Sequence, residues 1–469
     1  MKPRVRFAPS PTGQLHIGGV RTALFNYLFA RKNSGKYFMR IEDTDLERSR
    51  KEYIDQICES MIWLGLEWDE EIVFQSDRNQ LYQDAISNLL DKDRAYLCFS
   101  TKNELDIIRD EKGSYLYPGI WRDRHQSDIQ EQLDKQTPFT IRLKVPKDKT
   151  NIVFNDLIYG EITVSYNELD DFIIARSDGS PVYNLTNVVD DHDMGITHII
   201  RGEDHISNTP KQILLYQAFE WDIPKFAHLP MILGKDKKRL SKRHGSIGVQ
   251  SYRDKGYQPL AFLNYLSLLG WNPGNDEEIM SLDEIINKFE LKKVHKNSAV
   301  FDEKKFNWIS GQHLSLQLNE NILAELKNID INWGKHLSND MCISIIETMK
   351  VRSNSLLELI DQSHYFFNNP DYSNNELFTK ILKENTFRIL YLIKNILEEI
   401  DSWDDQMIEK KIKDFIIEYD FSFGDVMQPI RFAISGTLNG PSVFTILSIL
   451  GKKTCLNRID NILNMKRND

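Results

Sequence analysis

The chain has 469 residues, a formal net charge of −10, a hydrophobic fraction of 41% and a charged fraction of 27%. These values indicate a soluble globular protein, and at about 150 residues per domain the length favours about three domains. The acidic balance excludes a surface that attracts nucleic acid as a whole, so a polyanion site must be a local basic patch, and the chain lacks the run of about 18 apolar residues that predicts a membrane span.

Near the amino terminus, the pattern predicts a strand, a tight turn and a helix. Residues 5–8 form a short apolar run, and two prolines and a glycine in residues 9–13 stop it. Apolar side chains at helical spacing then predict a helix from about Val20 to Arg31, with Gly35 as its stop. This layout aims backbone N–H groups and the positive end of a helix dipole at one point, which suits a phosphate.

Three residues of this turn add to the interpretation. His16 places a side-chain donor beside that point, and Gly18 and Gly19 let a ligand approach the backbone closely. The alternative for this stretch alone is an ordinary strand–helix turn of an α/β protein, in which His16 only caps the helix.

A second strand and helix indicate a parallel sheet. Residues 37–41 predict a buried strand that ends in the acidic run 42–45, and such groups at the carboxyl end of a parallel strand lie where open α/β sheets bind ligands. Ser49 and Glu52 have the spacing of a capping box, which predicts the start of a helix that Gly65 ends. The resulting order predicts a doubly wound α/β sheet.

From about residue 91 to residue 189 the pattern changes, which predicts a mixed α+β insertion. The short strands expected there lie at residues 139–145, 152–154, 161–164 and 172–175. The parallel pattern then returns with a strand at 196–200, which ends in the polar cluster 201–205, and with a further strand at 227–233.

A basic run follows at residues 237–243, where five of seven residues are cationic. Its serine and the following glycine predict a loop instead of a helix face. A solvated charge run is the alternative, but the apolar Leu240 at its centre is not typical of a basic tail. Beyond Ser246 the pattern is helical, and we expect a separate all-helical domain from about residue 311.

The four cysteines, Cys58, Cys98, Cys342 and Cys455, are scattered without paired spacing. This arrangement predicts free thiols, and it argues against disulfides and against a metal knuckle. The first residues also lack the apolar core of a signal peptide, so we expect a cytoplasmic protein.

The segments His16-Ile-Gly-Gly19 and Arg239-Leu-Ser-Lys-Arg243 together resemble the HIGH and KMSKS elements of class I aminoacyl-tRNA synthetases. Further motifs narrow the resemblance to the bacterial glutamyl-tRNA synthetases and extend it over the whole chain. These motifs lie at residues 7–13, 40–45, 201–205, 240–245, 427–431 and 440–441.

Two departures from the family pattern are present. Gly19 stands where the first motif has a second histidine. The zinc knuckle of many bacterial relatives is also missing, because Cys98-Phe-Ser100 stands where they have a pair of cysteines, and Tyr115 and Tyr117 lie where later ligands would be sought. We therefore predict no structural zinc.

The resemblance implies a Rossmann-type catalytic domain, an α+β insertion and an all-α carboxyl-terminal domain that binds the anticodon. The expected boundaries are 1–90 and 190–245 for the two halves of the catalytic domain, 91–189 for the acceptor-end insertion, 246–310 for a helical stem-contact region and 311–469 for the anticodon-binding domain.

The reaction that the resemblance implies has two steps. The α-carboxylate of L-glutamate attacks the α-phosphorus of ATP, and the adenylate then esterifies the terminal ribose of tRNA. Negative charge accumulates at phosphorus, so catalysis depends mainly on positioning and electrostatic stabilisation. His16 and Lys242 are the expected catalytic residues, and Mg²⁺ should accompany ATP. The expected ATP-binding residues are Pro11, Thr12, Gly13, His16, Gly18, Gly19, Asp204, Arg239, Leu240, Ser241, Lys242 and Arg243.

By the same resemblance, Arg6 and Arg201 pair with the carboxylates of glutamate, and Glu42 receives its amino group. An arginine fork matches a carboxylate and rejects a neutral amide. The rest of the pocket is expected to comprise Ala8, Ser10, Tyr183 and Asn187. The alternatives are a surface charge for Arg6, core packing for Tyr183 and a metal-ligand role for Glu42.

The expected macromolecular partner is tRNA-Glu, with tRNA-Gln as an open alternative, and the expected state is a monomer. A glutaminyl-tRNA synthetase shares the catalytic half but typically ends in β-barrels. A catalytically inactive paralogue would have damaged motifs, and a nucleotidyltransferase for small molecules would not need the helical domain.

Overall fold

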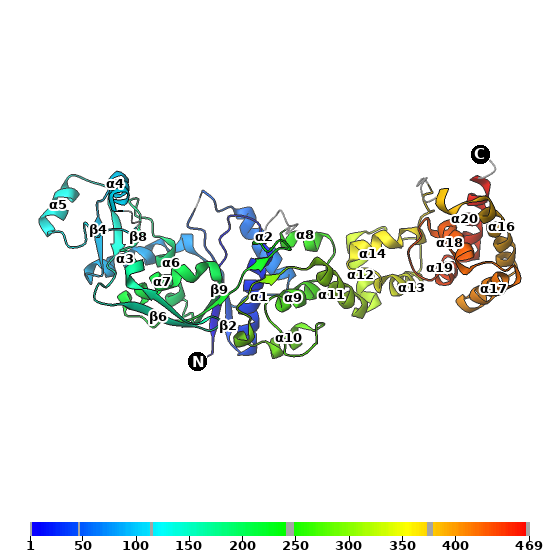
Figure 1. Ribbon diagram of the computed structural model, residues 1–469, viewed down its shortest axis with the longest axis horizontal. Coiled ribbons are helices and arrows are strands. Elements are labelled where there is room, and N and C mark those ends of the chain that lie inside the picture. The colour runs from blue at the N-terminus through cyan, green and yellow to red at the C-terminus, as the bar shows by residue number, and fades with distance from the viewer. Residues whose placement is uncertain (1, 46, 113–115, 241–247, 373–378, 466–469) are drawn as a thin grey trace. The chain divides into compact units, whose positions relative to one another are not determined.

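The computed structural model describes residues 2–45, 47–112, 116–240, 248–372 and 379–465. The chain divides into two compact units, which are described separately (Figure 1). The first unit comprises Met1–Tyr252 and Phe262–Glu303, and the second comprises Arg253–Ala261 and Lys304–Asp469. Among the described residues, no helix has the length and apolar character needed to cross a membrane.

The first unit begins with the expected parallel sheet, a three-stranded sheet in the order β1-β2-β3. Its elements are β1 (Arg4–Phe7), α1 (Ile17–Lys32), β2 (Lys36–Ile41), α2 (Lys51–Trp63) and β3 (Val73–Phe74). β1 is largely buried: Val5 is inaccessible and Phe7 is 5% exposed. Helix α1 ends at the basic residues Arg31 and Lys32, whose positive charges interact favourably with the negative end of the helix dipole.

The predicted capping box of the second helix is wrong. Helix α2 begins at Lys51 with Arg50 as its N-cap, and no side chain caps it. The backbone N–H of Ser49 donates to Asp45, and that of Arg50 donates to Pro11. These two bonds tie the segment to earlier parts of the chain, so the helix starts later than the spacing predicted.

A second sheet has four strands in the order β7-β6-β10-β9. Its strands are β6 (Asn151–Asp156), β7 (Gly160–Ser165), β9 (His198–Gly202) and β10 (Lys225–Leu229). β10 runs parallel to both β6 and β9, and β6 and β7 form an antiparallel hairpin. The hairpin therefore shares a sheet with β9, although it lies inside the segment that was predicted as an insertion.

The strand predicted at residues 227–233 is interrupted. β10 ends at Leu229, and a separate short strand β11 (Ile232–Leu233) pairs with β12 (Ala299–Val300). Pro230 lies at the break, and since proline has no N–H it cannot continue a ladder of hydrogen bonds. The break lets the chain leave the sheet beside the ends of β9 and β10.

A third, antiparallel sheet holds β4 (Ala95–Cys98), β5 (Thr140–Leu143) and β8 (Ile173–Ala175). Beside it, the Cys98 thiol donates to the Tyr117 hydroxyl at 3.3 Å, and the Arg142 guanidinium lies 3.9 Å from the Tyr117 ring. Tyr115 lies outside the described residues. Within the described part of the chain, no three His, Cys, Asp or Glu side chains form a group that could hold a metal ion.

Helices complete the two units. Those of residues 79–288 are α3 (Asn79–Asp91), α4 (Lys102–Lys112), α5 (Gln126–Asp134), α6 (Tyr183–Asp193), α7 (Thr209–Phe219), α8 (Val249–Asp254), α9 (Pro259–Leu268) and α10 (Leu282–Lys288). The later helices are α11 (Glu303–Leu316), α12 (Asn319–Ile329), α13 (Asn339–Lys350), α14 (Leu356–Ser363), α16 (Glu384–Glu398), α17 (Asp405–Glu418), α18 (Phe423–Ser435), α19 (Val443–Leu450) and α20 (Lys452–Met465).

From residue 311 onward every described regular element is a helix, and α12 to α20 are drawn in yellow to red in Figure 1. These helices share one apolar core, to which Ile345, Ile393 and Leu447 contribute. Parallel sheets followed by a helical unit confirm the predicted fold class.

Candidate active site

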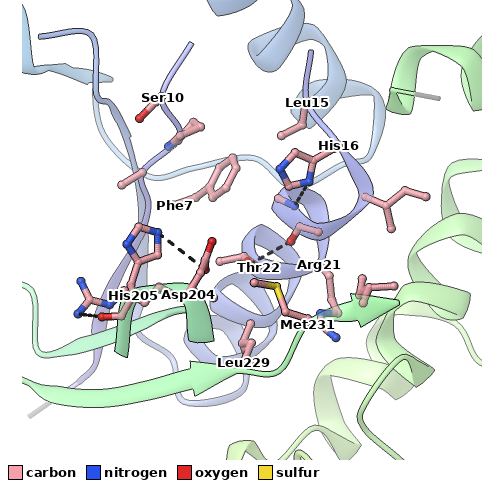
Figure 2. A pocket seen from close by; sticks show the side chains of 18 of the residues that line it. Phe7, Ser10, Leu15, His16, Arg21, Thr22, Asp204, His205, Leu229 and Met231 are labelled. Carbon is pink, nitrogen blue, oxygen red and sulfur yellow. Dashed lines mark hydrogen bonds and ion pairs between the residues drawn. The ribbon is translucent and has the colours of Figure 1, made fainter. Parts of the chain in front are cut away.

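A cavity of about 610 Å³ lies in the first unit where β1, β2, β9 and β10 end, beside the amino end of α1. Figure 2 shows the His16 and His205 rings and the Asp204 carboxylate around it. The predicted site residues that line this main cavity are Arg6, Ala8, Ser10, Gly13, His16, Gly18, Gly19, Glu42, Tyr183, Asn187, Arg201, Asp204, Arg239 and Leu240. Pro11 and Thr12 are not part of its lining. Ser241, Lys242 and Arg243 lie outside the described residues.

His16 both caps helix α1 and lines the cavity. Its Nδ1 accepts a hydrogen bond from the Gly19 backbone N–H at 3.1 Å. The acceptor role at Nδ1 places the ring proton on Nε2. Burial and the nearby Arg239 charge lower the pKa of His16, so the ring is neutral near pH 7 and offers an Nε2–H donor.

The glycines beside His16 make room for its ring. A Cβ atom on Gly18 would lie 3.2 Å from two ring atoms of His16, and one on Gly19 would lie 3.0 Å from Leu15 Cδ1. The first turn of α1 contains no acidic residue. No carboxylate of that turn compensates the positive end of the helix, which therefore suits an anion.

The described part of the basic run reaches the same cavity. Leu240 N–H donates to the Ile232 carbonyl at 3.0 Å, and a bridge joins Leu233 to Arg239. An Arg239 nitrogen lies 3.5 Å from Asp204 Oδ2. Thus two segments more than two hundred residues apart in sequence, around His16 and around Leu240, line one cavity.

Beneath the opposite half of the cavity lies a buried ionic network. Arg6 contacts both oxygens of Asp191, at 2.9 and 3.2 Å. Arg40 donates to Asp191 Oδ1 at 2.6 Å, to Glu42 Oε1 at 3.2 Å and to Asn187 Oδ1 at 2.9 Å. Burial raises the pKa of Glu42, whereas the two arginines hold the pKa of Asp191 below its usual value.

This network changes the interpretation of Arg6. The side chain is 3% exposed, so the surface-charge alternative is wrong. Its Nε and Nη2 atoms are engaged by Asp191, which leaves Nη1 as the nitrogen without a hydrogen bond in the described residues. Neither Asp191 nor Arg40 was predicted as a site residue; the signal for Asp191 was the pair of acids Asp190-Asp191, which follows two buried valines in one helix.

Arg201 is buried without a carboxylate partner among the described residues. It is 5% exposed, and its Nε donates to His228 Nε2 at 3.2 Å. Its Nη2 donates to Thr209 Oγ1 at 2.8 Å, and its Nη1 has no partner in the part of the chain that the structure describes. Burial lowers the pKa of Arg201. Because its contacts with the described residues are all neutral, no ion pair among those residues balances its positive charge.

Asn187 supplies a further unmatched donor, in addition to that of Arg201. Its Oδ1 accepts from Arg40, while its buried Nδ2 has no partner among the residues that the structure describes. Tyr183 and His205 lie beside these donors, with Tyr183 Oη 3.0 Å from His205 Nδ1. Burial raises the pKa of Tyr183 to about 12 and lowers the pKa of His205 to about 4, so both are neutral near pH 7.

The cavity therefore has two halves of different chemistry. The half at the amino end of α1 offers the His16 donor, backbone N–H groups and Arg239, which suit phosphates. The other half offers the unmatched donors of Arg201 and Asn187 beside the Glu42 carboxylate, which suit a ligand that carries both carboxylate and ammonium groups.

The second unit has its own unmatched cation. Arg431 on α18 is half-buried, and its buried Nη1 has no partner in the described residues. Burial lowers the pKa of Arg431, and so does the nearby charge of Arg352. Gly440 has a φ of 138°. A Cβ atom added at this position would lie 3.3 Å from Arg431 Nη1, so a side chain there would cover that nitrogen.

Comparisons with known proteins agree with this division. The chain matches the family described as tRNA synthetases class I (E and Q), catalytic domain, over residues 2–308, and an anticodon binding domain over residues 316–463. Glutamate–tRNA ligase 2 of Caldicellulosiruptor saccharolyticus is 40% identical, with 97% of this chain and 98% of the relative covered. Glutamate–tRNA ligase 1 of Helicobacter pylori is 42% identical, with 98% of each chain covered.

Solved structures agree as well. The crystal structure of a glutamate tRNA ligase from Elizabethkingia meningosepticum in complex with its amino acid superposes with a TM-score of 0.89 at 36% identity, covering 99% of each chain. The glutamate-tRNA synthetase of Elizabethkingia anophelis gives a TM-score of 0.86 at 36% identity, covering 99% of this chain and 100% of that one.

Proposed function

Because the chain belongs to the class I tRNA synthetases of the E and Q group, we propose that it ligates L-glutamate to tRNA through a glutamyl-adenylate. In the first step an α-carboxylate oxygen attacks the α-phosphorus of ATP, and diphosphate leaves. In the second step a ribose hydroxyl of the tRNA attacks the activated carbonyl carbon, and AMP leaves. The products are glutamyl-tRNA, AMP and diphosphate.

One observation carries the choice of amino acid: Arg201 is buried, lines the cavity and has no ion pair among the described residues. A side-chain carboxylate would fill this position, with Asn187 Nδ2 as a further donor. Glutamine would instead direct an amide NH₂ group at donors, and a polar site rejects a ligand that leaves its groups unpaired. Glu42 beside them suits the amino group of the substrate.

The ATP half works by positioning and electrostatics. The Nε2–H of His16 and the N–H groups at the start of α1 would bind phosphate oxygens as charge develops on them. Arg239 lies at the same side, and Ser241, Lys242 and Arg243 are proposed to continue this contact. A contact from a loop suits diphosphate departure, because it can strengthen as the transition state forms.

Mg²⁺ is proposed to enter with ATP as part of the substrate. The carboxylates that line the described cavity are Glu42 and Asp204, and each already faces an arginine. They do not form a set of oxygen ligands for a protein-bound cation, so phosphate oxygens and water would hold the ion.

For the tRNA, the second unit would bind the anticodon, and Arg431 with Arg352 is the cationic feature that we assign to this contact. Single-stranded bases are commonly held by arginine and aromatic side chains. We assign tRNA-Glu as the substrate, with tRNA-Gln as the second candidate. We further propose that the protein acts as a monomer in the cytoplasm.

The test is ATP–diphosphate exchange with tRNA present, followed by aminoacylation of purified tRNA-Glu and tRNA-Gln. Glutamate-dependent exchange, with glutamine inert, is the expected result. Exchange that prefers glutamine would contradict the assignment of Arg201, and charging of tRNA-Gln would identify a non-discriminating enzyme.

A further inference from the structure

We propose that His228 and Asp156 are positioning residues for glutamate recognition. Asp156 fixes His228 as the neutral tautomer with its proton on Nδ1, and this tautomer gives Arg201 an acceptor that orients the guanidinium without neutralising it. The inference rests on the proposed role of Arg201 in binding the substrate carboxylate.

Three neighbouring strands bring these residues together. Asp156 ends β6, His228 lies on β10, and Arg201 lies on β9 directly opposite His228 in the register. Their exposed fractions are 1%, 0% and 5%. Asp156 Oδ2 lies 2.7 Å from His228 Nδ1, and Arg201 Nε lies 3.2 Å from His228 Nε2.

Two contacts at His228 Nε2, with Arg201 Nε and with Thr209 Oγ1 at 3.1 Å, favour one protonation state of the ring. Arg201 Nε always carries a proton, so His228 Nε2 must accept it and cannot carry its own. The ring proton therefore lies on Nδ1 and is donated to Asp156. Burial lowers the pKa of His228, and so does the charge of Arg201, which agrees with a neutral ring.

The His228–Asp156 pair also explains why no ion pair neutralises the charge of Arg201 within the described residues. Asp156 is separated from Arg201 by the imidazole, and its oxygens accept four hydrogen bonds, from the backbone N–H groups of Ile158, Tyr159 and His228 and from the His228 ring. A carboxylate in direct contact with Arg201 would form an ion pair and compete with the substrate. A neutral imidazole instead holds Nε, while Nη1 stays without a partner in the described residues.

Asp156→Asn tests the tautomer directly. Asp156 Oδ1 accepts from two backbone N–H groups, so the amide oxygen of asparagine should stay there and turn its NH₂ group toward His228. His228 Nδ1 must then accept a hydrogen bond from that NH₂ group, so the ring proton moves to Nε2. There it faces the Nε–H of Arg201, which loses its acceptor. We expect the KM for glutamate to rise about tenfold or more, while the KM for ATP stays within about twofold, because a buried donor loses its partner.

Two substitutions of His228 separate positioning from packing. His228→Gln can present its amide oxygen to Arg201 Nε and should keep the KM for glutamate within about threefold of the original. His228→Leu fills the space without an acceptor and should raise it about tenfold or more. His198→Leu is the matched control, because His198 lies on the neighbouring strand β9 and does not line the main cavity; this substitution should leave both KM values unchanged.

The spectroscopic readout is NMR of protein labelled with ¹⁵N-histidine, in which His228→Gln identifies the His228 signals. The Nδ1–H form is expected in the parent protein and the Nε2–H form in Asp156→Asn. If Asp156→Asn does not fold, the Gln and Leu variants of His228 carry the kinetic test.

Arg201→Gln, measured in parallel, distinguishes the failures. If it raises the KM for glutamate and the Asp156 and His228 variants do not, the positioning role is wrong while the site assignment stands. If the His228 variants lower thermal stability and change both KM values alike, the pair is structural only. If Arg201→Gln itself has no effect, the proposed glutamate site and this inference both fall.

Discussion

Arg40 and Asp191 form a fully buried ion pair with a 2.6 Å contact, and their side chains are 0% and 2% exposed. Asp191 also receives the fork of Arg6, and Arg40 also holds Glu42 and Asn187. One carboxylate thus orients two arginines, and one of these orients two cavity residues. The floor of the amino-acid half is therefore preorganised before any substrate arrives.

Asp191→Asn should lower the free energy of unfolding by about 3–5 kcal/mol, because it removes the carboxylate charge that pairs with the buried guanidinium groups of Arg6 and Arg40. Urea unfolding measures this, with enzyme activity as a second readout. Glu131→Gln is the control: it breaks an exposed pair with Lys135 one helical turn away, and should cost about 0.5 kcal/mol or less. Equal losses in the two variants would contradict the structural role of Asp191.

Stability should fall as the pH drops from about 6.5 toward about 5. Burial lowers the pKa of both His198 and His205 to about 4. The unfolded histidine titrates near pH 6.5, so in this window the unfolded chain binds more protons and acid favours it. His198→Gln and His205→Gln should each flatten the dependence of melting temperature on pH. Curves parallel to that of the unaltered protein would exclude these histidines as its source.

Lys242→Ala should slow adenylate formation by about 10²–10³, the usual effect of removing one charged contact to a transition state. The fold should survive, since the sequence predicts a loop at this residue and not a strand or helix. Exchange measured with tRNA present is the assay, and circular dichroism checks the fold. An unchanged exchange rate would remove Lys242 from the mechanism.

Arg431→Gln should weaken tRNA binding about tenfold and leave the KM for ATP unchanged, because its unmatched donor lies in the second unit. Filter binding at fixed salt measures the affinity. Lys413→Gln is the control, since Lys413 pairs with Glu409 on the surface of α17. Similar losses in the two variants would indicate a general charge effect and not a specific contact.

The parts of the site that the sequence predicted are those carried by contiguous motifs. His16 with Gly18 and Gly19, and Arg239 with Leu240, could be found because strand–turn–helix order and a basic loop are local patterns. Glu42 lines the cavity, in agreement with the prediction that the acidic run at the end of this strand lies at a ligand site. The fold class was predictable for the same reason, since apolar periodicity reports each strand and helix separately.

The parts that were missed depend on contacts between distant segments. Arg6 meets Asp191 across 185 residues, and Asp156 meets His228 across 72. No local spacing distinguishes a buried aspartate that orients an arginine from one on the surface. The capping-box error has a related cause, because backbone bonds from Ser49 and Arg50 to earlier residues decided where α2 begins.

We propose that Arg201, which is buried and has no ion pair among the described residues, receives the side-chain carboxylate of glutamate. The direct measurement is the KM for glutamate in ATP–diphosphate exchange with tRNA present, for Arg201→Gln and for Arg201→Lys, which keeps the charge but loses the fork. We predict a rise of about 10²-fold or more for Gln, a smaller rise for Lys and an unchanged KM for ATP, since hydrogen-bonded charge pairs of this kind contribute about 2–5 kcal/mol. A KM for glutamate that barely moves in Arg201→Gln would contradict the claim.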